Sequence, residues 1–442
     1  MLDRVAAAAR CSGTWCVHVG LRFPAPLDAE RLARASSLLA EAEPVLGCRL
    51  VDGARAWETL PDPPLYVARG DHDALVCEPL DLEAGPPVRI AHDGDRLLVT
   101  ASHAATDGGG MVHLLGRLAA IYRALRDDPD HRPAVSEMDR GLDPLWRALP
   151  WKLRLAALSN AGDRLQTLRR AFPSHQLRIP VDGRTTETRF LVRELPSAPL
   201  VAWARARGGT VNDLLQAAML RALVAVEPWD GTTALTVNST VDLRRYLPGG
   251  RAAAVCNLST GTLVTLGREL GADLADTLGR VAAVTAAQKA RGRGLGLEVV
   301  GLPLLSWVPY ARLEAGVRQA LDAPRDGRRP ADSISNVGAI DPAWIAFDAP
   351  PVALDLRPQF LHPSRYQLAS YAFGGTTRLV SAVWPSAARE ERVRALLATP
   401  WWPRLAACEA PEPDDGAHAH VEPRRRHDEP SSSTPGWAAP GR

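Results

Sequence analysis

The sequence lacks several features that mark large classes of protein. Lysine is nearly absent, at Lys152 and Lys289 only, so almost every positive charge is an arginine. We interpret this deficit as the compositional bias of a GC-rich genome. The net charge is +2, from 52 basic and 50 acidic residues, which gives the chain no overall electrostatic attraction for nucleic acid. We therefore expect no nucleic-acid partner.

Cysteine and long apolar runs are also scarce. The 6 cysteines form no C-x-x-C pair and no Cys/His cluster at metal-ligand spacing, so neither a structural zinc site nor a disulfide scaffold is expected. The longest apolar run, residues 299–310, is too short to span a bilayer and contains two prolines. The amino-terminal residues lack the apolar segment of a signal peptide. We expect a soluble, cytoplasmic protein.

A short motif between a predicted strand and a predicted helix carries the chemistry. Residues 102–110 read SHAATDGGG, an H-x-x-x-D-G pattern. A neutral imidazole has a pKa of about 6.5 and can accept a proton from a hydroxyl or amine, so His103 is a candidate general base. The alternative is an ordinary core or loop histidine. The glycines are expected to reach φ > 0 and to bring the backbone close to a ligand. On the following helix, His113 falls on the polar stripe and is interpreted as solvated surface.

Two further motifs occur in the second half of the chain. Residues 208–218 read GGTVNDLLQAA, in which Thr210 and Asp213 predict a capping box at the start of a helix. The alternating residues 235–243 predict a strand, and the segment VDLRRYLP that ends it contains Arg244.

Residues 256–262 are expected to continue the same sheet. Residues 333–338 read SISNVG, where Ser335 and Asn336 offer hydrogen-bond donors that can stabilise an oxyanion. Residues 335–338, which read SNVG, also form a sequence that favours a turn, so both interpretations stay open.

In this order, the motifs resemble those of the CoA-dependent acyltransferase superfamily. Its members include chloramphenicol acetyltransferase, nonribosomal peptide condensation domains, mycobacterial polyketide-associated acyltransferases and plant BAHD acyltransferases. The resemblance covers residues 14–405 and implies an α/β fold of two chloramphenicol-acetyltransferase-like lobes. These would form a V, with the active site in a tunnel between them.

The resemblance also assigns roles to individual residues. His103 is the implied catalytic base, and Asp107 is implied to pair with Arg244 across the lobes. Asp107, Gly108 and Arg244 are then structural at the active site. A guanidinium and a carboxylate paired in this way hold the loop that carries His103 in one geometry. Ser335 and Asn336 are the implied oxyanion and tunnel candidates.

Two departures narrow the resemblance. Ser102 stands where peptide-forming condensation domains usually carry the first of two histidines, which argues against amide synthesis between carrier-bound aminoacyl units. The plant D-F-G-W-G motif has only a loose counterpart in residues 373–375, so a plant-type enzyme is not expected. A standalone bacterial acyltransferase fits best.

We therefore expect transfer of an acyl group from a thioester to a hydroxyl or amine acceptor, in natural-product or lipid biosynthesis. The donor would be acyl-CoA or an acyl carrier protein carrying a phosphopantetheine arm, acting as a substrate, with no metal and no bound cofactor. A monomer acting on a small-molecule acceptor is expected. One alternative is a non-catalytic condensation-like module that recruits a carrier protein. Another is a membrane-surface lipid acyltransferase of the wax-ester-synthase type.

The predicted organisation is an N-terminal lobe over residues 1–180, a C-terminal lobe over 181–408 and a disordered tail over 409–442. The tail has almost no large apolar residues to bury. Tryptophans and leucines alternate with basic residues over residues 142–180, which is typical of an amphipathic helix that can lie on an anionic membrane. The favoured interpretation of that stretch is a connector that packs its aromatic residues on a lobe.

Overall fold

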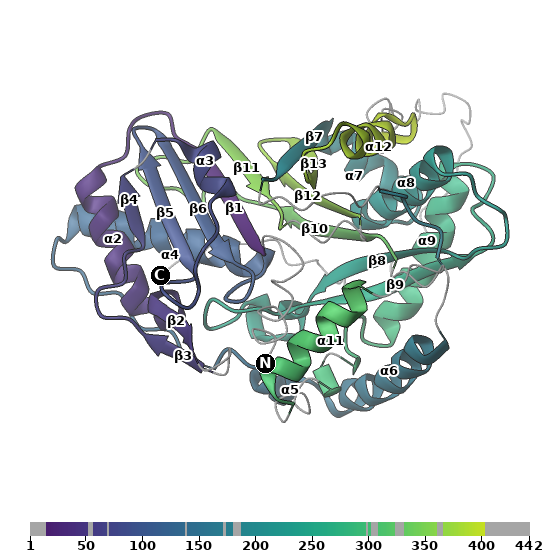
Figure 1. The fold of residues 1–442 in the computed structure, drawn as a ribbon, viewed down its shortest axis with the longest axis horizontal. Coiled ribbons are helices and arrows are strands. Elements are labelled where there is room, and N and C mark those ends of the chain that lie inside the picture. Colours follow the sequence, from purple (N-terminus) through teal and green to yellow (C-terminus); the bar gives the residue numbers. More distant parts are fainter. Residues whose placement is uncertain are drawn as a thin grey trace, which may run out of the picture.

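A computed structural model shows two mixed α/β lobes side by side, each built on its own sheet (Figure 1). The structure describes residues 15–51, 56–68, 70–137, 139–170, 174–179, 187–297, 299–301, 308–322, 331–359 and 366–402. The predicted boundary near residue 181 and the predicted tail lie outside these residues. The division of the chain at residue 180 stays a prediction.

The first lobe contains a five-stranded sheet in the order β11-β1-β6-β5-β4. Strand β1 pairs antiparallel with β6 on one side and with the edge strand β11 on the other. The strands are β1 (Cys16–Arg22), β4 (Tyr66–Ala68), β5 (Val88–Asp93), β6 (Arg96–Ser102) and β11 (Ala353–Arg357). A strand from the C-terminal half of the chain therefore completes the N-terminal sheet. A separate ribbon pairs β2 (Cys48–Val51) with β3 (Ala56–Thr59).

Helices α2 (Ala29–Ala42) and α4 (Gly108–Asp127) cover this sheet, and α3 (His72–Cys77) is a short third helix. Helix α2 begins directly after Asp28, whose side chain caps it by accepting from the Arg31 N–H at 3.0 Å. The leucines of α4 face inward into the largest core cluster, which also contains β1 and β6 residues. The apolar face of α4, whose residues repeat about every 3.6 positions, thus packs on the buried residues of the sheet.

The second lobe contains a six-stranded sheet in the order β7-β13-β12-β10-β8-β9. Its strands are β7 (Arg189–Pro196), β8 (Leu235–Asp242), β9 (Ser259–Gly267), β10 (Ser333–Ala339), β12 (Gln367–Phe373) and β13 (Thr376–Val383). Four helices lie on its side away from the first lobe (Figure 1): α7 (Ser197–Ala206), α8 (Val211–Val226), α9 (Leu274–Ala290) and α12 (Ala387–Ala398). The predicted capping box of Thr210 and Asp213 is present at the start of α8.

The remaining described elements connect the lobes or lie near their junction. They are α5 (Asp143–Ala148), α6 (Trp151–Arg170), α11 (Tyr310–Asp322) and the 3₁₀ turns η2 (Pro44–Gly47), η3 (Leu243–Tyr246) and η4 (Pro248–Gly250). Residues of α5 and α6 form a small core with residues Leu243, Cys256 and Leu258. None of the described helices combines the length and the hydrophobicity that a bilayer crossing needs.

Candidate functional site

His103 lies in the short loop between β6, which ends at Ser102, and α4, which begins at Gly108. Its main chain is fixed from both sides: the His103 N–H donates to the Trp15 carbonyl at 2.6 Å, and the His103 carbonyl accepts from Asn257 Nδ2 at 2.7 Å. The imidazole packs edge-on against the Trp15 ring, with centroids 5.6 Å apart. Both the backbone and the ring of His103 are therefore held in one position.

The surroundings of the imidazole favour its neutral form. His103 is half-buried, and no group of the described residues meets its buried Nδ1 with the distance and angle of a hydrogen bond. Burial lowers the pKa of His103, and the charge of Asp107 with the nearby polar groups of His103 and Asn257 offsets this only in part. The ring is thus uncharged near neutral pH. Because Nδ1 is buried, Nε2 is the nitrogen that can reach a substrate.

The structure brings Asp107 and Arg244 together in a buried, two-pronged ion pair, the contact that the family resemblance implies. Arg244 Nη2 lies 2.9 Å from Asp107 Oδ1, and Arg244 Nη1 lies 3.1 Å from Asp107 Oδ2. Arg244 is 5% exposed and Asp107 is 2% exposed. Arg244 also donates to the Cys256 carbonyl at 2.7 Å and to Asp242 Oδ1 at 3.1 Å. The parallel geometry is the strong form of this interaction.

Backbone donors complete the coordination of the Asp107 carboxylate. The Gly110 N–H donates to Oδ1 at 2.8 Å and the Leu258 N–H donates to Oδ2 at 2.7 Å, so each oxygen has one backbone donor and one guanidinium nitrogen within 3.1 Å. Burial by itself would raise the pKa of Asp107, but the charge of Arg244 and these donors hold it below its ordinary value. A carboxylate with every acceptor site occupied is suited to holding the loop rather than carrying a proton.

The three glycines after Asp107 serve a purpose different from the predicted one. Gly108, Gly109 and Gly110 form the first turn of α4, and none of them has a positive φ. A Cβ on Gly109 would lie 2.8 Å from Arg244 Nη1, and one on Gly110 would lie 2.7 Å from the carbonyl oxygen of Cys256. The expected φ > 0 is therefore wrong: glycine is needed here because the ion pair occupies the space of a side chain.

Residues 254–258, which we call the strap, come from the second lobe and hold the His103 loop. Besides the bonds from Asn257 and Leu258, the Val255 N–H donates to Glu43 Oε2 at 2.9 Å. Arg140 Nε donates to the Val255 carbonyl at 2.7 Å, and its Nη2 donates to the Ala105 carbonyl. The predicted continuation of the sheet over residues 256–262 is wrong for 256–258, because β9 begins at Ser259.

The sequence analysis missed Asn257 as a site residue. The available signal was a lone amide between the apolar residues Cys256 and Leu258, since a polar side chain in such a context is usually buried and hydrogen-bonded. Asn257 is 4% exposed. What the pattern could not show was its partner, a carbonyl more than 150 positions away.

Glu43 supports the strap from the first lobe and changes the interpretation of His113. The Glu43 carboxylate is 1% exposed, with His113 Nε2 at 3.6 Å and Arg117 Nε at 3.2 Å. His113 is half-buried, so its predicted place on the solvated surface is wrong. Burial would raise the pKa of Glu43, but the nearby His113 and the hydrogen bond from the Val255 N–H lower it. The buried charge on Glu43 explains why the polar stripe of α4 turns inward here.

Ser335 and Asn336 lie half-buried on β10, beside the start of α4. A Cβ on Gly108 would lie 3.1 Å from Val337 Cγ2, which shows how closely this strand approaches the motif. The Ser335 hydroxyl accepts from Thr240 Oγ1 at 3.3 Å, and Asn336 Oδ1 accepts from the Gly338 N–H at 2.9 Å. The bond from Gly338 to Asn336 fits the turn interpretation. It involves only the side-chain oxygen of Asn336 and not its amide N–H groups. The oxyanion role stays a prediction.

The environment next to His103 is apolar. Ala104, Leu50, Leu82 and Tyr310 are buried together. Half-buried Trp15, Trp57, Leu80 and Leu313 pack on this cluster. Side chains of this kind accommodate hydrocarbon better than charge. Among the described residues, no group of three or more His, Cys, Asp or Glu side chains is placed to hold a metal ion.

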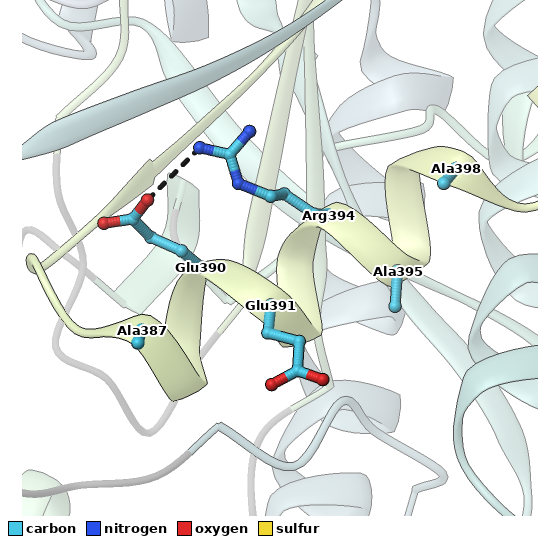
Figure 2. Close-up of a pocket in the computed structure, with 6 residues that line it drawn as sticks. All are labelled: Ala387, Glu390, Glu391, Arg394, Ala395 and Ala398. Carbon is cyan, nitrogen blue, oxygen red and sulfur yellow. Dashed lines mark hydrogen bonds and ion pairs between the residues drawn. The ribbon is translucent and has the colours of Figure 1, made fainter.

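Figure 2 shows a pocket that does not belong to this site. It is lined by one helix, α12, through residues Ala387, Glu390, Glu391, Arg394, Ala395 and Ala398. Glu390 Oε2 and Arg394 Nη2 form an ion pair at 3.2 Å across one helical turn, and Glu390 also pairs with Arg189 at 3.1 Å. These are ordinary surface pairs on an open depression. One surface helix alone lines the pocket, which contains none of the predicted site residues.

No protein-family model and no curated protein matches the chain. Solved structures do match. Polyketide synthase associated protein 5 from Mycobacterium tuberculosis is 16% identical, with 92% of this chain and 95% of that chain covered and a TM-score of 0.63. The first condensation domain of the calcium-dependent antibiotic synthetase is 16% identical, with 92% and 96% covered and a TM-score of 0.64. The EpoB cyclization-docking bidomain from Sorangium cellulosum is 15% identical, with 92% and 84% covered and a TM-score of 0.60. The chain therefore has the condensation-domain fold of two chloramphenicol-acetyltransferase-like lobes, as its motifs predict.

Proposed function

We propose that this protein transfers an acyl group from a thioester to a hydroxyl or amine acceptor, with His103 as the general base. The observation that carries the proposal is the state of His103: a neutral imidazole, fixed through its own main chain, beside a carboxylate whose acceptor sites are all occupied. The condensation-domain fold supports an acyl-transfer role at the coarser level.

In the proposed reaction, the acceptor oxygen or nitrogen attacks the thioester carbonyl carbon while His103 Nε2 takes the acceptor's proton. The tetrahedral intermediate then collapses, the carbon–sulfur bond breaks, and the imidazolium returns the proton to the leaving thiolate. No covalent acyl-enzyme is needed. General-base action contributes a factor of about 100 to 10,000, and the alignment of the two reactants contributes the rest. Ser335 and Asn336 are the proposed donors to the oxyanion.

The proposed donor is acyl-CoA or an acyl carrier protein with a phosphopantetheine arm. The apolar cluster that contains Ala104 and Tyr310 lies directly beside His103 and supports an acyl group with hydrocarbon character. The structural neighbours include a polyketide synthase associated protein and a bidomain of a nonribosomal peptide synthetase, which supports a natural-product setting. We propose that the chain acts as a monomer on a small-molecule acceptor.

The test is a panel of acyl-CoA and acyl-carrier donors with alcohol and amine acceptors, followed by mass spectrometry of the product and of the released thiol. His103→Ala should lower turnover at least about 100-fold with the fold intact. His131→Ala, on a surface loop, is the matched control and should keep full turnover. Because the pKa of His103 is lowered, the fall of kcat/KM in acid should have its midpoint below the ordinary histidine pKa of about 6.5.

Two results would contradict the proposal. Near-normal turnover by His103→Ala would remove the assigned base. A wild-type protein that turns over no donor but binds a carrier protein would instead be the non-catalytic recruiting module.

A further inference from the structure

Helix α6 presents an apolar stripe to solvent. Six large hydrophobic residues are exposed in the part of the chain that the structure describes, and three of them lie on this helix. Trp151 is 66% exposed, Leu155 56% and Leu158 51%. Their spacing of four and three residues puts them on one face of the helix. The other three exposed residues, Val135, Val192 and Val352, are scattered over separate segments.

The opposite face of α6 is packed, so the orientation of the stripe is fixed. Ala157 and Leu153 belong to the small core with Leu258 and Leu295. Asn160 Nδ2 donates to the carbonyls of Arg291 and Leu295 at 2.9 and 2.8 Å. The connector interpretation accounts for this packed face only. It leaves three bulky apolar side chains exposed on α6, which lies at the lower right of the molecule in Figure 1.

The charge around the stripe is positive. Over residues 151–170, α6 contains five basic residues and one acidic residue. The acidic residue, Asp163, is already paired with Arg291 at 2.7 Å. Lys152 is exposed beside the stripe, 5.9 Å from the Trp151 ring, and Lys289 is exposed near the end of α9, which contacts α6 through Arg291. Lys152 therefore places an exposed positive charge beside the apolar residues, on a helix whose sequence is basic overall.

We propose that the outer face of α6 docks this protein on an anionic lipid bilayer. An interfacial helix has a low overall hydrophobicity, tryptophan and leucine on one face, and lysine and arginine beside them. Trp151 suits the boundary between headgroups and acyl chains, because its ring is apolar and its N–H is polar. The cations would add attraction to anionic headgroups. This proposal is independent of the acyl-transfer reaction.

The test is co-sedimentation of the full chain with vesicles of neutral phosphatidylcholine and with vesicles containing one quarter phosphatidylglycerol. Binding to the anionic vesicles should be at least tenfold stronger and should weaken as salt is raised. The stripe variant Trp151→Ser/Leu155→Ser/Leu158→Ser should lose at least tenfold of that binding. The matched control Val135→Ser/Val192→Ser/Val352→Ser removes equally exposed apolar residues elsewhere and should bind as the wild type does.

A second variant keeps the test decisive if the stripe variant folds poorly: Lys152→Glu should weaken binding to the anionic vesicles only. Equal binding by wild type and both stripe-side variants would overturn the proposal. A second result would also overturn the proposal: light scattering shows a wild-type dimer, the stripe variant is a monomer, and none of the proteins binds vesicles. Turnover of a water-soluble thioester by the stripe variant should be unchanged, which separates failure of this proposal from failure of the proposed function.

Discussion

A single amide, Asn257, joins the second lobe to the backbone of His103. Its Nδ2 lies 2.7 Å from the His103 carbonyl and 3.4 Å from that of Ala104. The carbonyls sit in a buried setting, so a lost donor leaves them without compensation. Asn257 therefore fixes the main chain from which the imidazole extends, while the Trp15 ring packs against the imidazole itself.

Asn257→Ala should therefore lower kcat by about 10- to 100-fold with little change in KM, since a small displacement of a catalytic group is costly. The free energy of unfolding should fall by about 1–3 kcal/mol. The measurement is steady-state kinetics beside urea unfolding. Asn160→Ala is a matched control, because Asn160 also donates to two carbonyls, but away from His103. It should lose stability and keep kcat; equal loss of kcat in both variants would refute the positioning role.

At the level of residues, the sequence was informative where chemistry is encoded locally. His103, Asp107 and Arg244 stand in motifs whose order is legible along the chain, and the structure brings Asp107 and Arg244 into contact. The roles of Glu43 and Asn257 could not be predicted, because each acts on a backbone group distant in the sequence. The spacing of residues along the chain does not predict such a contact.

The start of α4 is constrained by a neighbouring segment as well as by its own cap, Asp107. A Cβ on Gly110 would lie 2.1 Å from Thr106 Oγ1 and 2.7 Å from a backbone carbonyl, so something must move. Gly279, within α9, has open space around the same position. The two glycines differ in surroundings but both lie in helices.

Gly110→Ala should destabilise the protein by about 1–3 kcal/mol through overpacking and should displace Arg244. Gly279→Ala should instead stabilise it by about 0.5–1 kcal/mol, because alanine favours the helix. Thermal and urea unfolding of the two variants give the comparison. A Gly110→Ala protein as stable as Gly279→Ala would show that the turn has room for a side chain.

Strand β1 carries a buried histidine that makes the first sheet sensitive to acid. His18 is 3% exposed, with Nδ1 3.0 Å from Thr100 Oγ1. Burial, together with the charges of Arg357 and Arg89, lowers the pKa of His18 to about 3. The unfolded chain accepts this proton near pH 6.5, whereas the folded chain does not until about pH 3. Protonation therefore favours unfolding as the pH falls through this range.

His18→Gln should reduce the loss of unfolding free energy between pH 7 and pH 4.5, as measured in urea. The half-exposed His131→Gln is the control and should leave the pH dependence close to that of the wild type. An unchanged pH dependence in His18→Gln would mean that other groups account for the acid response.

Most elements were predictable because their signals are local. The caps at Asp28 and Thr210 mark the starts of α2 and α8, and alternation marks β8. Two adjacent glycines are typical of a hairpin turn, and residues 374–375 join β12 and β13 with positive φ at both. Strand order was not predictable from alternation, since a pattern of buried residues does not name the neighbouring strand.

At the scale of the whole molecule, the Asp107–Arg244 pair joins the start of α4 in the first lobe to η3 in the second. Asp107→Asn or Arg244→Met should each cost about 3–5 kcal/mol of stability, because each leaves an uncompensated buried charge. The double variant should cost less than the sum of the two. Urea unfolding and turnover of the four proteins measure the coupling. Additive losses would show that the pair does not act as a unit.

The pairing of β1 with β11 also governs how the chain can be made. Positions 22 and 353 must meet before the first sheet has its fifth strand, and a ribosome needs roughly 17 to 66 s to synthesise the residues between them. During that time β1 is an open edge, which is a template for association with other chains. An N-terminal fragment ending near residue 180 would keep that edge permanently. We therefore expect chaperones to be most important while the first lobe is still nascent, because the edge of β1 is then unpaired.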